Sequence, residues 1–332
     1  RPVLHIGGMR PPKPCLLPTT PSTRRQLLAH GVTAQMIRTA LSSGRLYRIR
    51  RGVFIDSTVW PEHARDQHLI RALAELEVCP SGVLSHESAG AAWQLPHPGF
   101  GQWHDAPVSL TLPRSESSRA RRGRVVHHLA ELVPSVVTRD PEGRPVTTLA
   151  RTAVDLATGR PLPEALVILD GAARLLCAAM ISNPRRTDYA NPRLMAAARE
   201  LFAQAADARL PAGLTQAIEL TDARRESPPE SLSAGHFHLA GLPEPAYQVM
   251  IDTPIGQLFP DFYWPEHRLV GECDGAVKYA DPQGYAREKE REQVLRDLDY
   301  PMVRWLAKCI CGDRLLQPAW VAMGATLLSV KT

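Results

Sequence analysis

The pattern of apolar positions in the first 56 residues predicts two short helices followed by a pair of strands. The stretch "STRRQLLAHG" places Thr23 as an N-cap with Gln26 three residues later, a capping-box spacing, and Gly31 follows as a helix stop. The next stretch, "TAQMIRTALSSG", has apolar residues at helical spacing and ends at Gly44. The stretch "RLYRIRRGVFI" alternates and contains Arg-Gly, which indicates two strands around a turn. This order predicts a winged helix-turn-helix over 20–56.

The segment 57–222 mixes both periodicities and predicts an α+β region. Helical spacing appears in "HARDQHLIRALAELE", "LARTAVDLAT" and "EALVILDGAARLLCAAM". Strand patterns appear in "APVSLTLP" and in the residues that end "RARRGRVVHH", where a basic turn comes first. We expect "ISNPRRTDYANPR" to be a surface loop and "LMAAARELFAQAADARL" to be a helical linker.

The last segment, 223–332, predicts a domain of its own. Its order is a helix ("PPESLSAGHFHLAGL"), three strands ("AYQVMID", "QLFPDFYW" and "RLVGECDG"), a helix ("YAREKEREQVLRDLD") and a strand ("PMVRWLA"). Residues 1–19 are expected to form a flexible basic arm. The whole chain is therefore predicted to be an α/β multidomain protein, in which the last domain has a mixed sheet flanked by helices.

Composition narrows the class of protein without naming its function. The 332 residues suffice for two or three domains, and a hydrophobic content of 44% with 22% charged residues is typical of soluble globular proteins. No apolar run approaches the ~18 residues that a membrane-spanning helix needs. The six cysteines form no CxxC pair, so we expect reduced thiols in a cytoplasmic protein with no membrane partner. The net charge of +5 permits an anionic partner such as DNA.

The candidate chemistry lies in acidic residues of the last domain. Glu272 and Asp274 sit two residues apart on an apolar strand, so both point to one face of the sheet. If Trp264 pairs with Leu269 across the "PEHR" loop, Asp261 faces Glu272 at roughly 5 Å between β-carbons. Like charges placed in this way destabilise a sheet unless a cation lies between them. We therefore expect Asp261, Glu272 and Asp274 to bind Mg²⁺ (or Mn²⁺), which prefers oxygen ligands.

Neighbouring charged residues extend this candidate site. Glu288 and Arg291 share a helical stripe with Leu295 and Leu298, which should turn both charges toward the acids, although a helix-surface ion pair is the simpler reading. Lys278 follows the acidic strand and could stabilise the charge of a transition state. Upstream, Glu230 opens a helix and could add a carboxylate. The open alternative for the three acids is a solvated strand end.

The last domain resembles a known family of nucleases. The residues that carry the likeness are "ESPPES", "GLPEP", "PDFYWPEHRLVGECDGAVKY" and "EKEREQVLRDLDYPMVRW", over roughly 226–310. They resemble actinobacterial endonuclease-like domains related to very short patch repair endonucleases, of the PD-(D/E)XK superfamily. The resemblance implies Mg²⁺-dependent hydrolysis of phosphodiester bonds, with Asp261 as the motif acid, Glu272 as the second acid and Glu230 as the helix acid. The Glu-x-Lys of the superfamily reads Glu272-Cys273-Asp274 here, so either Lys278 replaces the usual lysine or the activity has been lost.

The first segment carries a basic surface suited to DNA. The predicted wing contains four arginines within seven residues, and the second helix adds one more; the set is Arg38, Arg45, Arg48, Arg50 and Arg51. Such residues could neutralise phosphates while the helix meets base edges in a major groove. A solvated charged face is the alternative reading.

The first two segments also resemble a family of regulators. The stretches "VTAQMIRTALSSGRLYRIRRGVFI", "VLSHESAGAAWQLP" and "VTTLARTAVDLA", over roughly 20–180, are similar to AbiEi-type antitoxins. The resemblance implies a DNA-binding module, autoregulation of an operon and a cognate toxin as a possible partner. Within these stretches Ser85 is expected to be an N-cap rather than a nucleophile, and Arg151 with Asp155 an i, i+4 ion pair. Three hypotheses follow: a DNA-directed nuclease, a non-catalytic antitoxin-like repressor, and a protein that only captures a toxin.

Overall fold

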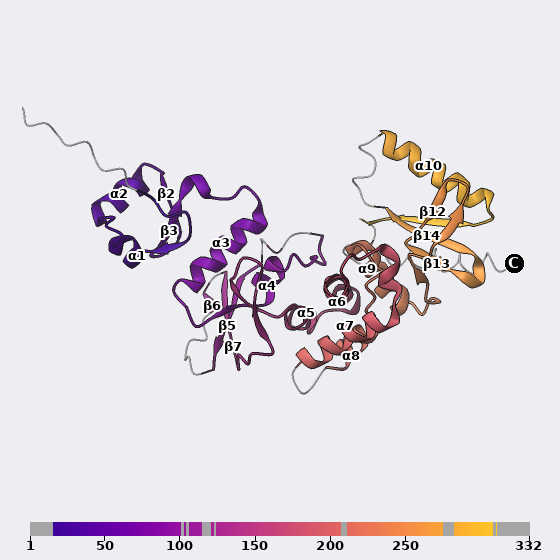
Figure 1. The fold of residues 1–332 in the computed structure, drawn as a ribbon, viewed down its shortest axis with the longest axis horizontal. Coiled ribbons are helices and arrows are strands. Elements are labelled where there is room, and N and C mark those ends of the chain that lie inside the picture. Colours follow the sequence, from indigo (N-terminus) through magenta and orange to yellow (C-terminus); the bar gives the residue numbers. More distant parts are fainter. Residues whose placement is uncertain are drawn as a thin grey trace, which may run out of the picture.

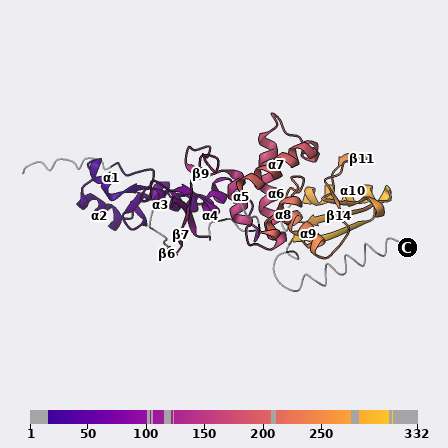
Figure 2. The same cartoon turned by 90° about the horizontal axis from the view of Figure 1, so that it is seen from below.

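The computed structural model describes residues 16–100, 103, 106–114, 121–122, 124–206, 211–274, 282–307 and 310. Lys278 and most of the predicted basic arm lie outside these residues. The chain runs through three successive bodies, with the first and last segments at opposite ends of the molecule (Figures 1 and 2). Among the described residues, none of the helices has the length and apolar content needed to cross a bilayer.

The first body is the predicted helix-turn-helix with a wing. Its elements are β1 (Ser22–Thr23), α1 (Arg24–Ala29), α2 (Ala34–Ser42), β2 (Leu46–Arg50) and β3 (Val53–Asp56), with sheet order β1-β3-β2. The predicted capping box is confirmed, because the Thr23 hydroxyl accepts from the Gln26 amide and the Gln26 side chain accepts from Thr23. Gly31 and Gly44 end the two helices with positive φ angles of 82° and 72°, which favour glycine.

The second body is a six-stranded sheet with order β6-β7-β5-β4-β9-β8. Its strands are β4 (Val83–Leu84), β5 (Val108–Pro113), β6 (Arg121–Arg122), β7 (Val125–Ala130), β8 (Val137–Arg139) and β9 (Pro145–Thr147). The helices that accompany it are α3 (Ala64–Leu76), α4 (His86–Ala92) and α5 (Leu149–Ala157), which bury their apolar faces against the sheet in one cluster. The pattern-based predictions for α3, β5, β7 and α5 are confirmed.

A helical layer joins this sheet to the last body. It contains α6 (Leu162–Ala179), α7 (Pro192–Ala205) and α8 (Ala212–Glu219). The central helix α6 lies beside α9 (Pro228–Leu239), as Figure 1 shows, and it contributes Val167 to the core of the last body. The close crossing needs a glycine at position 235, because a β-carbon there would lie 2.5 Å from the Pro163 backbone.

The last body is a mixed sheet with a helix on each face. Its order is β10 (Ala246–Tyr247), β13 (Phe262–Trp264), β14 (Leu269–Asp274) and β15 (Met302–Leu306); β14 and β15 are parallel, and the other pairs are antiparallel. On one face α9 packs Phe237 against aromatic residues of the sheet. On the other face α10 (Pro282–Asp297) buries Leu295 beside Val270, as its stripe predicted. The predicted register, with Trp264 opposite Leu269, is confirmed.

Two predictions about strands were wrong, and two about the segment 181–210 were right only in part, since the loop is mostly exposed and the linker is helical. The stretch "AYQVMID" divides into β10 and β11 (Ile251–Thr253), because Gln248 turns the chain with a φ of 49°. The stretch "QLFPDFYW" divides into β12 (Gly256–Leu258) and β13, separated by Pro260, which has no N–H to donate to a ladder. The predicted surface loop contains a 3-10 helix (Arg186–Ala190) with Tyr189 buried, and the predicted linker α7 buries Phe202 in the core.

Candidate functional site

The first candidate site is the surface of α2 and the β2–β3 wing. Thr33 caps α2 by accepting from the Met36 amide, which fixes the start of the helix. The side chains of Arg38 on α2 and of Arg45 and Arg48 beside and on β2 are exposed, as is Arg51 in the turn. The segment has a strongly positive charge because it carries one carboxylate, Asp56, against the arginines Arg24, Arg25, Arg38, Arg45, Arg48, Arg50 and Arg51.

Arg50 is the one member of the predicted DNA-binding set that points elsewhere. Its guanidinium donates to Glu75 Oε2 on α3, where the Glu75 side chain is only 5% exposed. The other oxygen of that carboxylate lies 2.9 Å from His127 Nε2 on β7. Arg50 therefore ties the winged helix to α3, although its side chain stays 37% exposed.

The second candidate site is a pair of carboxylates at the edge of the last sheet. Glu230 lies in the first turn of α9, is 5% exposed and accepts from the Glu226 amide and the Ser227 hydroxyl. Asp261 lies just before β13, and its Oδ2 accepts from the Cys273 amide at 2.9 Å. The Gln248 side chain joins the two acids, because its Nε2 donates to Glu230 Oε2 and to Asp261 Oδ1, at 3.3 Å each.

Burial and mutual repulsion perturb this pair. Burial first and the charge of Asp261 second raise the pKa of Glu230 to about 7, against the hydrogen bonds from Ser227 and from the Glu226 amide, which lower it. Burial also raises the pKa of the Cys273 thiol, and the charges of Asp261 and Glu230 add to that rise. Two neighbouring carboxyls, one of them buried, cannot easily both be ionised, and a bound cation would relieve the repulsion between them. The pair is therefore a candidate cation site.

Glu272 and Asp274 form a separate group on the face of the sheet that α10 covers. Both are buried, at 3% and 5% exposure. The counter-ion of Asp274 is a residue that the sequence did not suggest: Arg304 on β15, opposite Glu272 in the parallel ladder. Arg304 holds both oxygens of Asp274, at 2.9 and 2.8 Å, and also donates to Glu288 at 2.7 Å.

The two residues predicted on α10 do turn inward. Glu288 pairs with Arg304, and Arg291 lies 3.8 Å from Glu272 and 3.3 Å from Glu288. Both expectations for this pair are therefore confirmed. Glu288 and Arg291 form an ion pair on the helix, and both side chains also contact charged residues of the sheet. A further acid, Glu292, accepts from Arg304 at 3.3 Å and from Lys289 at 2.8 Å.

The arrangement bears on the predicted metal ligands. Among the described residues, the group of three side chains that brings potential ligand atoms within 4.8 Å of one another is Glu75, Cys79 and His127, not the predicted acids. Asp261 faces a backbone amide, and Asp274 is neutralised by a guanidinium. The predicted magnesium site at Asp261, Glu272 and Asp274 stays a prediction, for which Glu230 and Asp261 offer the more suitable acids.

A third polar cluster lies where α4 meets β7. The rings of His86 and His128 stack at 3.6 Å, and burial lowers the pKa of each to about 4, so both are neutral near pH 7. Arg151 and Asp155 form the predicted ion pair at 2.8 Å. Ser85 occupies the predicted N-cap position, but its hydroxyl makes no capping bond and lies 3.1 Å from His86 Nδ1.

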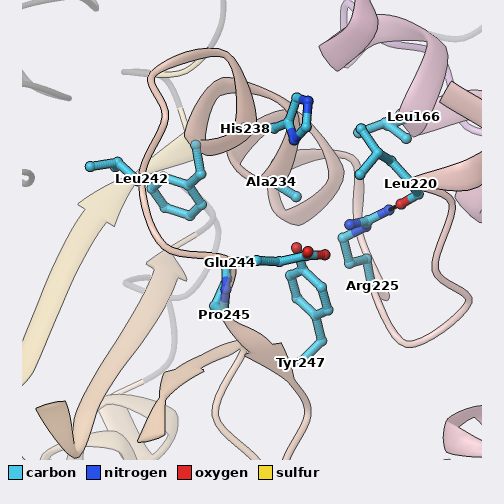
Figure 3. Close-up of a pocket in the computed structure, with 10 residues that line it drawn as sticks. Leu166, Leu220, Arg225, Ala234, His238, Leu242, Glu244, Pro245 and Tyr247 are labelled. Atoms are coloured by element: carbon cyan, nitrogen blue, oxygen red, sulfur yellow. Dashed lines mark hydrogen bonds between the residues drawn. The ribbon is translucent and has the colours of Figure 1, made fainter. Parts of the chain in front are cut away.

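A small cavity lies between α9, the end of α8 and β10 (Figure 3). Its volume is about 30 Å³, and its polar lining groups include Arg225, His238, Glu244 and Tyr247. Such a space holds one or two water molecules and no substrate. Arg225 is engaged there in a buried ion pair with Asp170 of α6, at 2.6 and 2.8 Å, so the cavity belongs to the joint between bodies.

Comparison with known proteins finds a similarity for the first body. Residues 23–55 match the family described as "Transcriptional regulator, AbiEi antitoxin". This segment is similar to the AbiEi antitoxin domain of transcriptional regulators, and it is called the AbiEi domain below. The matched residues span α1, α2 and the wing, so the AbiEi domain carries the basic surface described above.

Similarity to two curated proteins extends well beyond the AbiEi domain. These are the uncharacterized proteins MT2308 and Rv2248 of Mycobacterium tuberculosis, from strains CDC 1551 and H37Rv. Each is 28% identical over 276 residues, which cover 82% of this chain and 89% of the relative. The relatives therefore share most of the length of the chain, and their names carry no function.

Proposed function

We propose that this protein is a transcriptional regulator that binds DNA through α2 and the wing of its AbiEi domain. The observation that carries the proposal is the exposed positive charge of the matched segment, with Arg38 on the second helix and Arg45, Arg48 and Arg51 on the wing. Arginines on a wing neutralise phosphates, and the side chains of the second helix read base edges. Binding of the operator of its own gene and of a cognate toxin are the further expectations that the family brings.

The test is a salt titration of DNA binding. Wild-type protein and the Arg45→Ala/Arg48→Ala variant are titrated into a labelled duplex from upstream of the gene, by fluorescence anisotropy. Each lost phosphate contact should lower the slope of log K against log salt by about 0.9, so the double variant should lose nearly two. Arg193→Ala, an exposed arginine of α7, is the control and should leave the slope unchanged. An unchanged slope in the double variant would remove the wing from the interface.

A second candidate function is hydrolysis of DNA by the last body, delivered by the AbiEi domain. The favouring observation is the Glu230–Asp261 pair, where one carboxyl has a pKa near 7 and both acids meet at Gln248. This donor set fits Mg²⁺, which takes a small number of carboxylates and keeps several waters. Glu230 and Asp261 would hold the ion, and Glu272, which follows the Gly271 that pairs with Phe262, is tested as a third ligand. The ion would supply an activated water and polarise the phosphate. Asp274 fits less well, because Arg304 occupies both of its oxygens.

The nuclease proposal is tested by plasmid nicking with Mg²⁺, Mn²⁺ or EDTA. The variants are Asp261→Asn and Glu272→Ala, and the control is Glu219→Gln, an exposed acid of α8. Nicking that requires a divalent ion and disappears in both variants but not in the control would support hydrolysis. If the wild-type protein nicks no DNA with either metal, the last body acts as a non-catalytic part of the regulator.

A further inference from the structure

A second group of metal-ligating side chains lies far along the chain from the acids of the last body. Glu75 lies in the last turn of α3, Cys79 follows one turn later, and His127 comes from β7. A carboxylate oxygen, the thiol sulfur and an imidazole nitrogen lie within 4.8 Å of one another. The Glu75 and His127 side chains are 5% and 7% exposed, and the Cys79 side chain is a thiol rather than half of a disulfide.

We propose that Glu75, Cys79 and His127 bind a divalent transition-metal ion of the zinc class. One sulfur, one nitrogen and one oxygen donor are the mixture that Zn²⁺ accepts, whereas Mg²⁺ and Ca²⁺ prefer oxygen ligands alone. Three protein ligands leave a fourth tetrahedral position for water. The site lies at the joint between the winged helix and the six-stranded sheet, because Arg50 of β2 donates to the same Glu75 carboxylate.

The ligands need to move little to bind an ion. His127 Nε2 and Glu75 Oε1 are 2.9 Å apart, as a direct hydrogen bond requires. Tetrahedral Zn²⁺ with bonds near 2.0–2.1 Å separates its nitrogen and oxygen ligands by roughly 3.3 Å. The ion would therefore replace the proton between these atoms after a shift of a few tenths of an ångström. The Cys79 sulfur lies within 4.8 Å of both atoms, and it would move about 1 Å toward them to reach the ion.

The hydrogen bonds of this group do not satisfy the whole His127 ring. Its Nδ1 is buried and has no hydrogen-bond partner in the described part of the chain. A buried imidazole with one unmatched nitrogen is costly, and it is a common ligand of Zn²⁺ in its neutral form. The ring is therefore not a fully bonded core histidine, although an ion held by Nε2 would leave Nδ1 unmatched.

Arg50 gives the proposal a consequence that an ordinary ion pair lacks. It shares the Glu75 carboxylate, with Oε2 facing the guanidinium and Oε1 facing His127. A metal ion and Arg50 therefore compete for the negative charge of one carboxylate. Removal of the guanidinium, which competes with the ion for the Glu75 carboxylate, should therefore strengthen metal binding. If the group is only a structural ion network, removal of Arg50 creates no metal affinity.

The test uses the full-length, metal-free protein and Co²⁺ as a spectroscopic substitute for Zn²⁺. A thiolate-to-cobalt charge-transfer band should appear with one ion per chain and should disappear when Zn²⁺ displaces Co²⁺. Cys79→Ser should abolish the band, and His127→Gln should weaken Co²⁺ binding at least about tenfold, while Arg50→Ala should strengthen it. Cys177→Ala, which removes a buried thiol of α6, should leave the band unchanged. Circular dichroism checks that each variant is folded.

Two results would overturn the proposal. One is a wild-type protein that shows no charge-transfer band at any Co²⁺ concentration that leaves it soluble. The other is a Cys79→Ser or Glu75→Gln variant that folds and binds Co²⁺ as tightly as wild type, with the same band. With Cys79→Ser this result would mean that the thiolate comes from another cysteine, and with Glu75→Gln that the carboxylate is not a ligand.

Discussion

Glu230→Gln should make the protein about 1 kcal/mol less stable than wild type at acidic pH and more stable than wild type at alkaline pH. Glu230 is 5% exposed, and burial raises its pKa from 4.5 to about 7, with Asp261 adding to the rise. Glutamine keeps the size of the side chain and imitates the neutral acid. It can accept from only one of the two groups that now donate to the carboxyl, the Ser227 hydroxyl and the Glu226 amide, which costs about 1 kcal/mol at every pH.

The sign follows from proton binding in the two states. Between pH 4.5 and 7 the unfolded chain has lost the Glu230 proton while the folded chain keeps it, so a rise in pH favours unfolding. The stability contributed by the neutral acid is complete below pH 4.5 and is lost as the pH rises through 7. A pKa rise from 4.5 to about 7 corresponds to roughly 3 kcal/mol. The variant should therefore gain up to about 3 kcal/mol relative to wild type across this window.

The assay is urea denaturation of both proteins in EDTA at several pH values from 4.5 to 8. The measured quantity is the difference in free energy of unfolding between variant and wild type, which should grow with pH and level off above 7. Glu219→Gln, on the exposed surface of α8, should give a flat difference. If the difference for Glu230→Gln is also independent of pH, the Glu230 carboxyl ionises normally. The argument that Glu230 and Asp261 favour a bound cation would then be refuted.

Three further predictions concern buried charge. Arg225→Met should lower the free energy of unfolding by about 3–5 kcal/mol, because it leaves the buried carboxylate of Asp170 without a counter-ion. Adding Asp170→Leu to the same chain should restore most of the lost stability, as measured by urea denaturation. Arg304→Met should lower the stability of the last body by about 3 kcal/mol, and Mg²⁺ should raise the melting temperature of this variant more than that of wild type. His128→Phe should resist acid better than wild type in a pH titration followed by circular dichroism, because stability held by neutral His86 and His128 is lost as the pH falls from 6.5 to about 4.

Local patterns predicted the elements that depend on near neighbours in the chain. The Thr23–Gln26 capping box, the register of Trp264 with Leu269 and the inward face of Glu288 and Arg291 all follow from spacings of a few residues. Each spacing has one favourable geometry, so the pattern and the structure agree.

Long-range pairings account for what the sequence could not predict. Arg304 reaches Asp274 only because β15 pairs in parallel with β14 after the α10 crossover, and no local pattern fixes that register. Gln248 lies between Glu230 and Asp261 because of a positive φ angle that a propensity does not reveal. The sequence predicted that the strand acids need a cation, and that physical argument holds for Asp274, although the cation there is a guanidinium.

The acids of the last body divide into a group that stabilises the fold and a pair that could bind a cation. On the face that α10 covers, Asp274 has a permanent counter-ion in Arg304, so its role is to hold β14, β15 and α10 together. Toward α9, Glu230 and Asp261 share an amide from Gln248, and one of them holds a proton near pH 7. Loss of Asp274 should therefore reduce stability, whereas loss of Asp261 should reduce any metal-dependent activity more than stability. If Asp261→Asn instead destabilises the fold as strongly as Asp274→Asn and leaves DNA binding intact, both groups serve the scaffold and the regulator needs no hydrolysis.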